Sequence, residues 1–210
     1  MKLQKVGGFG SVASALIGAM AMVIIAFVFP RLGLVGPADR MDPIKGMNAE
    51  SASPITFVLF NLDLILWGMA FVLIILALRE RMQPKTPNLM RLAVIGVSTT
   101  YAAMLATGLI GILGMPSIVT AKDASAYRAF MGIYFGLMVL GDHAAGWAVL
   151  LSGWAALKTR SLSRIFGYFS VLVGIVFIIE FAAKPLMPVS LVLSIIWGVW
   201  LGAVLLRSKT

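Results

Sequence analysis

Six apolar runs divide the chain, and short polar or charged stretches separate them. Each run is close to 20 residues or longer, the length that an α-helix needs to cross the ~30 Å hydrocarbon core of a bilayer. The pattern predicts an all-α, polytopic transmembrane helical bundle with six spans, in a single membrane domain of residues 1–210. The expected spans are residues 9–30, 54–78, 90–114, 127–157, 164–183 and 189–206.

The charged residues predict an orientation for this bundle. Eleven Lys and Arg residues fall on the side of the N-terminus and six on the other. Cytoplasmic loops carry the excess of basic residues, so both termini are expected in the cytoplasm. The first run follows Lys2 and Lys5 and ends at Pro30-Arg31 without a small-residue cleavage pattern, which favours a retained span over a signal peptide. The connection 31–53 is then an external loop, either a lid or partner contact or an irregular solvated segment.

Composition agrees with a membrane location. Hydrophobic residues make up 60% of the chain and charged residues 12%, with a mean hydropathy of +1.00. A soluble domain has about 25% charged residues, so a water-soluble fold would leave too much apolar surface uncovered. The net charge of +9 lies in short clusters between apolar runs. That arrangement indicates a lipid bilayer as partner and no nucleic acid.

The residue types of this chain allow few kinds of metal or cofactor site. Cysteine is absent, which excludes disulfides and thiolate metal sites, and the single histidine is His143. A zinc site of the usual kind and bis-histidine haem ligation are therefore not expected, no metal site is predicted, and the cofactor is left unknown. No serine-hydrolase, metalloprotease or phosphate-loop motif occurs, so no catalytic residue is assigned.

Small residues at helical spacing occur in two spans. Gly198 and Gly202 form one G-x-x-x-G pattern, and Gly132 and Gly136 form another. Such notches let two helix backbones approach closely in a membrane. They predict helix packing, either within the chain, which a six-span bundle favours, or in a homo- or hetero-oligomer.

Polar residues inside the spans are the candidate site, because a charge in hydrocarbon is costly. They gather from mid-membrane to the outer surface and comprise Asn61, Asp63, Tyr101, Asp142, His143 and Glu180. One interpretation is an outward-open binding or proton-relay cavity built on Asp63, Asp142 and His143. The other is a hydrogen-bonded cluster that holds helices in register, for example through Asp63 and His143. Asp142 and His143 point about 100° apart on a helix, which favours the cluster. For Glu180, a solvated surface pair with Lys184 is expected.

Residues 141–181 resemble a known family. Gly141-Asp-His-Ala-Ala-Gly-Trp147 is followed by the turn Lys158-Thr-Arg-Ser-Leu-Ser-Arg164 and then by Ile-Phe-Gly-Tyr168. This order resembles small bacterial membrane proteins of about six spans, classified only as a domain of unknown function, in which the turn reads R-S-x-x-x-P-R-x-x-G. Ser163 stands where Pro is usual. The resemblance implies a multi-span protein of the bacterial inner membrane and assigns no activity.

Three functions are compatible with these features. The first is a non-enzymatic accessory or scaffold subunit, which the missing motifs and the small size favour. The second is a small permease or proton-linked carrier that uses the polar layer. The third is a cofactor- or quinone-binding membrane subunit.

Overall fold

The chain folds into a bundle of long helices, seen here in a computed structural model that describes residues 3–180, 182 and 186–207. Every regular element among these residues is helical. Five helices are long and apolar enough to cross a membrane, and a shorter apolar helix accompanies them. The protein is therefore a multi-pass helical membrane protein.

The first crossing is assembled from three consecutive elements. These are α1 (Leu3–Val23), the π-helical turn η1 (Ile24–Val28) and α2 (Phe29–Arg31). The other long helices are α5 (Pro54–Met82), α6 (Pro87–Ala121), α7 (Ala124–Thr159) and α9 (Met187–Arg207), and the shorter helix is α8 (Arg164–Ile179).

Local sequence signals explain where the helices begin. Proline is the first residue of α5 and of α6, where its missing N–H costs nothing. Asp123 caps α7 by accepting hydrogen bonds from the backbone N–H groups of Ser125 and Ala126. Ser163 caps α8 through the N–H of Phe166.

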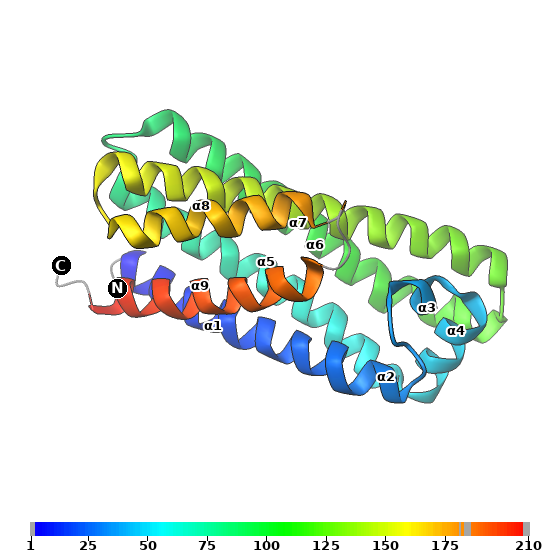
Figure 1. Cartoon of the computed structure of the whole chain (residues 1–210). Coiled ribbons are helices and arrows are strands. Elements are labelled where there is room, and N and C mark those ends of the chain that lie inside the picture. The colour runs from blue at the N-terminus through cyan, green and yellow to red at the C-terminus, as the bar shows by residue number, and fades with distance from the viewer. Residues whose placement is uncertain (1–2, 181, 183–185, 208–210) are drawn as a thin grey trace.

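Residues 31–53 contain two short helices rather than irregular chain. They are α3 (Pro37–Met41) and α4 (Pro43–Ala52), and Asp42 caps the second by accepting from the N–H groups of Ile44 and Lys45. They sit at the end of the bundle opposite to the start of α1 and the end of α9 (Figure 1). We call these the loop end and the terminal end.

Neighbouring helices follow the order α9, α1, α5, α6, α7, α8, and limited contact between α8 and α9 closes the ring. At the terminal end the ring is tightly filled. Phe71, Ile74, Ile75 and Leu78 of α5 are each at most 2% exposed, and they pack in one core with Trp197 of α9. The Trp197 indole N–H donates to the Ser170 hydroxyl across the α8–α9 junction, at 2.9 Å. The terminal half is therefore a closed and tightly packed core.

Candidate functional site

A cavity of about 390 Å³ lies inside the ring, in the half nearer the loop end. Its walls come from α1 with η1, from α5, α6 and α7, and from the residues around the α8–α9 connection. Pockets that hold small molecules have volumes of about 300–1,000 Å³, so this cavity is of ligand size. Ile25 and Ala26 of η1 form part of its wall. A π-helical turn inside an α-helix is frequently found at functional sites.

Three acidic side chains from different helices line this cavity. They are Asp63 of α5, Asp142 of α7 and Glu180, which directly follows α8. Glu180 accepts a hydrogen bond from the Ser190 hydroxyl and lies close enough to Asp142 for the two carboxyls to interact electrostatically. The fold thus brings together acids that are far apart in the sequence.

Two of the carboxyl groups have an oxygen without a protein partner. Asp63 is 3% exposed and Glu180 is 9% exposed, and Asp63 Oδ1 and Glu180 Oε2 accept no hydrogen bond from the described residues. Leaving a buried polar atom unsatisfied costs about 1–3 kcal/mol, and more for a charged group. Both oxygens are therefore suited to a proton, a water or a bound ligand in the cavity.

The rest of the wall is mostly apolar and aromatic. Phe60, Trp67 and Phe177 contribute rings, and Met104 and Met138 contribute flexible thioether chains. The only further side chains with polar groups are Trp67, Ser190 and Ser194, and among the described lining residues none is Lys, Arg or His. The described wall of the cavity therefore combines acidic groups with apolar side chains and includes no cationic one.

An aromatic stack separates the cavity from the terminal end. Trp67 stacks on Phe71, with ring centroids 4.9 Å apart, and on Phe177 at 6.4 Å. Phe71 in turn packs on Trp197 at 5.7 Å. In the other direction the lining reaches exposed residues, among them Val35, which is 80% exposed. The cavity is thus closed toward the terminal end and reaches the surface near the loop end.

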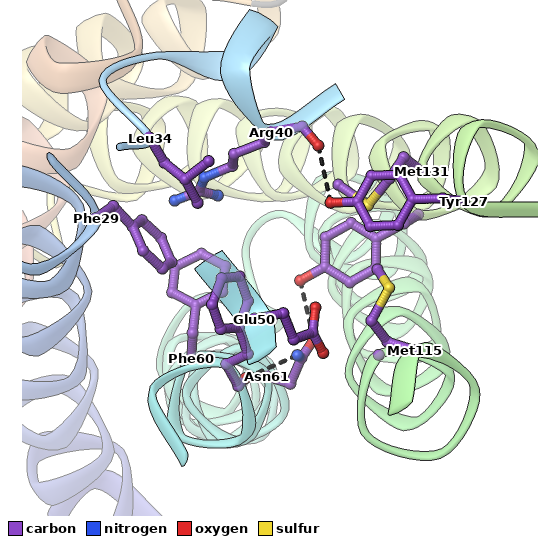
Figure 2. A pocket seen from close by; sticks show the side chains of 12 residues that line it. Phe29, Leu34, Arg40, Glu50, Phe60, Asn61, Met115, Tyr127 and Met131 are labelled. Atoms are coloured by element: carbon purple, nitrogen blue, oxygen red, sulfur yellow. Dashed lines mark hydrogen bonds between the residues drawn. The ribbon is translucent and has the colours of Figure 1, made fainter. Parts of the chain in front are cut away.

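A second, smaller cavity of about 30 Å³ lies beneath the short helices at the loop end. Figure 2 shows the Arg40 side chain of α3 and the Glu50 side chain of α4 entering it, with Tyr127 of α7 beside them. The Arg40 guanidinium lies 3.9 Å above the centre of the Phe29 ring and 5.0 Å from that of Phe60, a cation–π arrangement. This volume has room for a water molecule.

Hydrogen bonds tie the short helices and α5 to α7 around this small cavity (Figure 2). The Tyr127 hydroxyl donates to the backbone oxygen of Arg40 at 3.0 Å. The Tyr134 hydroxyl donates to Asn61 Oδ1 at 2.9 Å, and Asn61 Nδ2 donates to the backbone oxygen of Phe57. Phe60 lines both cavities. The short helices are therefore fastened over the loop end of the bundle.

Burial shifts the pKa values of Arg40 and Glu50, the two charged groups that these short helices place in the small cavity. It raises the pKa of Glu50 to about 7. It lowers the pKa of Arg40 to about 10, which leaves the guanidinium charged at neutral pH. Near neutral pH the small cavity thus holds a fixed positive charge and a carboxyl that gains or loses a proton.

The residues predicted from the sequence do not all share one site. Asp63, Asp142 and Glu180 line the large cavity, and Asn61 lines the small one. Tyr101 lines neither and lies beside Gly68 of α5.

The proposed pairing of Asp63 with His143 is wrong. No hydrogen bond joins these two described residues, and His143 Nε2 instead accepts from the Trp147 indole N–H at 3.2 Å. The 100° separation along α7 turns Asp142 into the cavity and leaves His143 out of its lining.

Glu180 differs from its expected role as part of a solvated pair. Its side chain is 9% exposed and faces the large cavity. Lys184, the expected partner, lies outside the described residues. The structure thus buries a carboxyl that the sequence places near an interface.

The two glycine notches have different surroundings. A Cβ at Gly198 would lie 3.0 Å from the backbone oxygen of Ser11, so this notch packs α9 on α1 within the chain, as does Gly202 against Val12. A Cβ at Gly132 or Gly136 would meet nothing within 4 Å, and both glycines are exposed. Only the first notch is used for packing inside the bundle.

Sequence reasoning missed Arg40 and Glu50, the tyrosines Tyr127 and Tyr134, and the aromatic wall residue Trp67. A signal for α4 was present, since Asp42-Pro43 is a favoured helix start and buried Gly46, Ala49 and Glu50 follow at helical spacing. No such signal marks the tyrosines, whose bonds join segments far apart in the chain.

No group of three or more acidic or histidine side chains among the described residues could hold a metal ion. Comparison with known proteins adds no assignment: no protein-family model, no curated protein and no solved structure matches the chain.

Proposed function

We propose that the protein is a small proton-linked carrier with an outward-facing solute cavity. The observation that carries the proposal is the meeting of Asp63, Asp142 and Glu180, from three helical segments, in one cavity of about 390 Å³. An isolated carboxylate in an apolar wall is costly, so such a group holds a proton or a bound cation. When a proton and a cation exchange at the same carboxyl group, movement of the cation is coupled to movement of the proton in the simplest way.

The topology of this proposal is six spans with both termini in the cytoplasm of a bacterial cell and the bundle in the inner membrane. α8 provides the fifth crossing. Its 16 residues correspond to about 24 Å of helix, which approaches the ~30 Å thickness of the hydrocarbon core. In support, α1 begins and α9 ends at the same end of the bundle (Figure 1), and the excess of basic residues lies on that side of the spans.

In this orientation the cavity faces outward. The stack of Trp67, Phe71 and Phe177 forms the inner gate, and α3 and α4 stand at the outer mouth. The α8–α9 junction is where an inward path opens most readily, because α8 and α9 share fewer contacts than the other neighbouring helices of the ring. A carrier must alternate access in this way, with its gates closed in turn around a fixed site.

The matched test uses neighbouring residues of α7 that face different ways. Protein in proteoliposomes with a trapped pH-sensitive dye is given a pH gradient and a panel of cationic, zwitterionic and neutral solutes. We expect a cationic solute to dissipate the gradient with wild type and with His143→Ala, and not with Asp142→Asn, which cannot bind the exchanged proton. Solute-dependent proton movement that persists in Asp142→Asn, or its absence for the whole panel, contradicts the carrier.

The exposed face of Gly132 and Gly136 favours a second candidate, the accessory or scaffold subunit. A small-residue groove open to lipid is suited to a helix of another chain or another copy. The mass of the purified protein-detergent complex tests this, because an accessory subunit of that kind is isolated with its partner or as an oligomer.

A further inference from the structure

The wall of the large cavity restricts the kind of molecule that it accepts. Three carboxyl groups supply negative charge or protons, and no Lys, Arg or His among the described lining residues opposes them. An anion would face uncompensated like charge, which is strongly unfavourable in an apolar environment. The ligand is thus expected to be a cation or a neutral molecule.

Polar groups are too few for a sugar, an amino acid or another highly hydrated solute. Beyond the acids, the wall offers Ser190, Ser194 and the indole of Trp67, and Ser190 is already bonded to Glu180. A hydrated solute would give up hydrogen bonds to water without replacement, at a cost of at least 1–3 kcal/mol for each lost bond on mutational scales. The wall therefore fits a molecule with an apolar body.

A bare metal cation fits poorly for a different reason. The carboxyls come from three helical segments, and the described acidic and histidine side chains nowhere form a metal-binding group of three or more. A larger cation can touch separated carboxyls at once. Phe60, Trp67 and Phe177 give such a cation an aromatic wall, and Met104 and Met138 adapt to its shape.

We propose that the large cavity binds a hydrophobic organic cation, an apolar body that carries one positive charge, against the carboxyls of Asp63, Asp142 and Glu180. The unpartnered oxygens Asp63 Oδ1 and Glu180 Oε2 supply free acceptors for that charge. This proposal names the ligand of the proposed carrier, so transport of the ligand rests on the proposed function. Binding of the ligand can be measured without any transport.

Protons compete with this ligand for the same groups. Among the residues that the structure describes, the ionisable groups that face the cavity are Asp63 on α5, Asp142 on α7 and Glu180 after α8, while α1, α6 and α9 contribute none to its lining. Protonation of these carboxyls removes the charge that holds the cation. The affinity for the cation therefore falls as the pH falls. Conversely, binding of the cation releases protons from these carboxyls.

Tetraphenylphosphonium is a suitable probe, because tetraphenylborate has nearly the same shape and the opposite charge. Equilibrium dialysis of the purified full-length protein in a non-ionic detergent measures the binding of both, with protein-free micelles as the background. We expect saturable binding of the phosphonium and none of the borate. Binding should weaken about tenfold or more from pH 8 to pH 5, a difference of about 1.4 kcal/mol or more.

Variants then locate the site. Asp63→Asn and Asp142→Asn should each weaken phosphonium binding about tenfold, and His143→Ala should leave it unchanged, because His143 is not part of the lining. Size-exclusion profiles and melting curves show whether each variant is folded. If an asparagine variant fails to fold, phosphonium binding by Glu180→Gln and the pH dependence of binding by the wild type test the site instead.

Each outcome bears on the proposal separately from the carrier function. Equal binding of phosphonium and borate, pH-independent binding, or an equal loss in His143→Ala overturns the ligand class. Phosphonium that binds as expected but is not moved by a pH gradient overturns the carrier and keeps the site. Gradient-driven movement of a hydrophilic solute without phosphonium binding overturns the ligand class alone.

Discussion

Glu50 shows how a short connecting helix acquires a pH-sensitive group. Its side chain is 7% exposed, and it enters the small cavity beside Tyr127 and Tyr134. Burial raises the pKa of this carboxyl to about 7 from its ordinary value of 4.5. The folded protein thus holds a proton on Glu50 that the unfolded chain releases between these two pH values.

This difference predicts a direction for stability against pH. A group whose pKa is raised by folding stabilises the fold at low pH, and this contribution is lost as the pH rises from about 4.5 to about 7. We expect the apparent melting temperature in detergent to fall between pH 5 and pH 8. Replacement by Gln should reduce that fall by the equivalent of about 1–3 kcal/mol.

The control for Glu50→Gln is Glu80→Gln, because Glu80 is an exposed glutamate on α5, far from the small cavity. Its melting profile should follow that of the wild type at each pH. If Glu50→Gln keeps the full pH dependence, the dependence belongs to other carboxyls and the role assigned to Glu50 is wrong.

At the scale of single residues the sequence predicts which acids matter and not what surrounds them. Asp63 and Asp142 stand out because a charge within a span needs a reason, and both line the cavity. Arg40 and Glu50 could not be selected, since charged residues in a polar connection are ordinary. Their burial results from the docking of α3 and α4 by Tyr127, a contact across 87 residues.

Among the helices, the α1–α9 contact is the clearest case of packing by small residues. Besides the close approach of Gly198 to α1, the Ser11 hydroxyl donates to the backbone oxygen of Gly198 at 2.9 Å. Helices in lipid gain little from apolar burial against each other, so close backbone contact and such hydrogen bonds carry the association. A side chain at position 198 would separate the two helices.

We therefore expect Gly198→Leu to destabilise the protein in detergent by about 1–3 kcal/mol through overpacking. Gly132→Leu is the matched control, because that position is open and Leu is the better helix former. Thermal unfolding followed by circular dichroism compares the two. Equal melting temperatures for both variants contradict the packing role of Gly198, and a change of complex mass in Gly132→Leu reveals an interface at the exposed face.

The apolar runs of the sequence predict that the helices exist, but they do not predict the local irregularities within the helices. Each run of the sequence coincides with a long or apolar helix of the described chain, and Pro54 and Pro87 mark two starts. The π-helical turn at Ile24–Val28 has no pattern of its own, because its residues are as apolar as those around it. The π-helical turn depends on the tertiary contacts of the first crossing, which a local sequence pattern does not contain.

For the whole molecule, the Trp-Gly pairs of three spans suggest a repeated hairpin that the side chains do not support. Trp67 and Trp197 both turn inward and pack on Phe71. Trp147 is 45% exposed and turns to the outside of the bundle. The corresponding residues therefore have different environments: two of the three tryptophans pack inside the bundle and the third does not.

The number of crossings is decided by α8, because it is the shortest helix of the ring. The chain contains no cysteine, so single cysteines report accessibility without a background. Lys158→Cys precedes α8, Ala182→Cys follows it, and Ser51→Cys lies on α4 as the external reference; all three positions are exposed. With six spans, a membrane-impermeant maleimide added to intact cells should label positions 51 and 182 at once. It should label position 158 only after the membrane is permeabilised. Labelling of 158 and 182 from the same side would make α8 a helix that does not cross, leave five crossings, and place the two termini on opposite sides of the membrane.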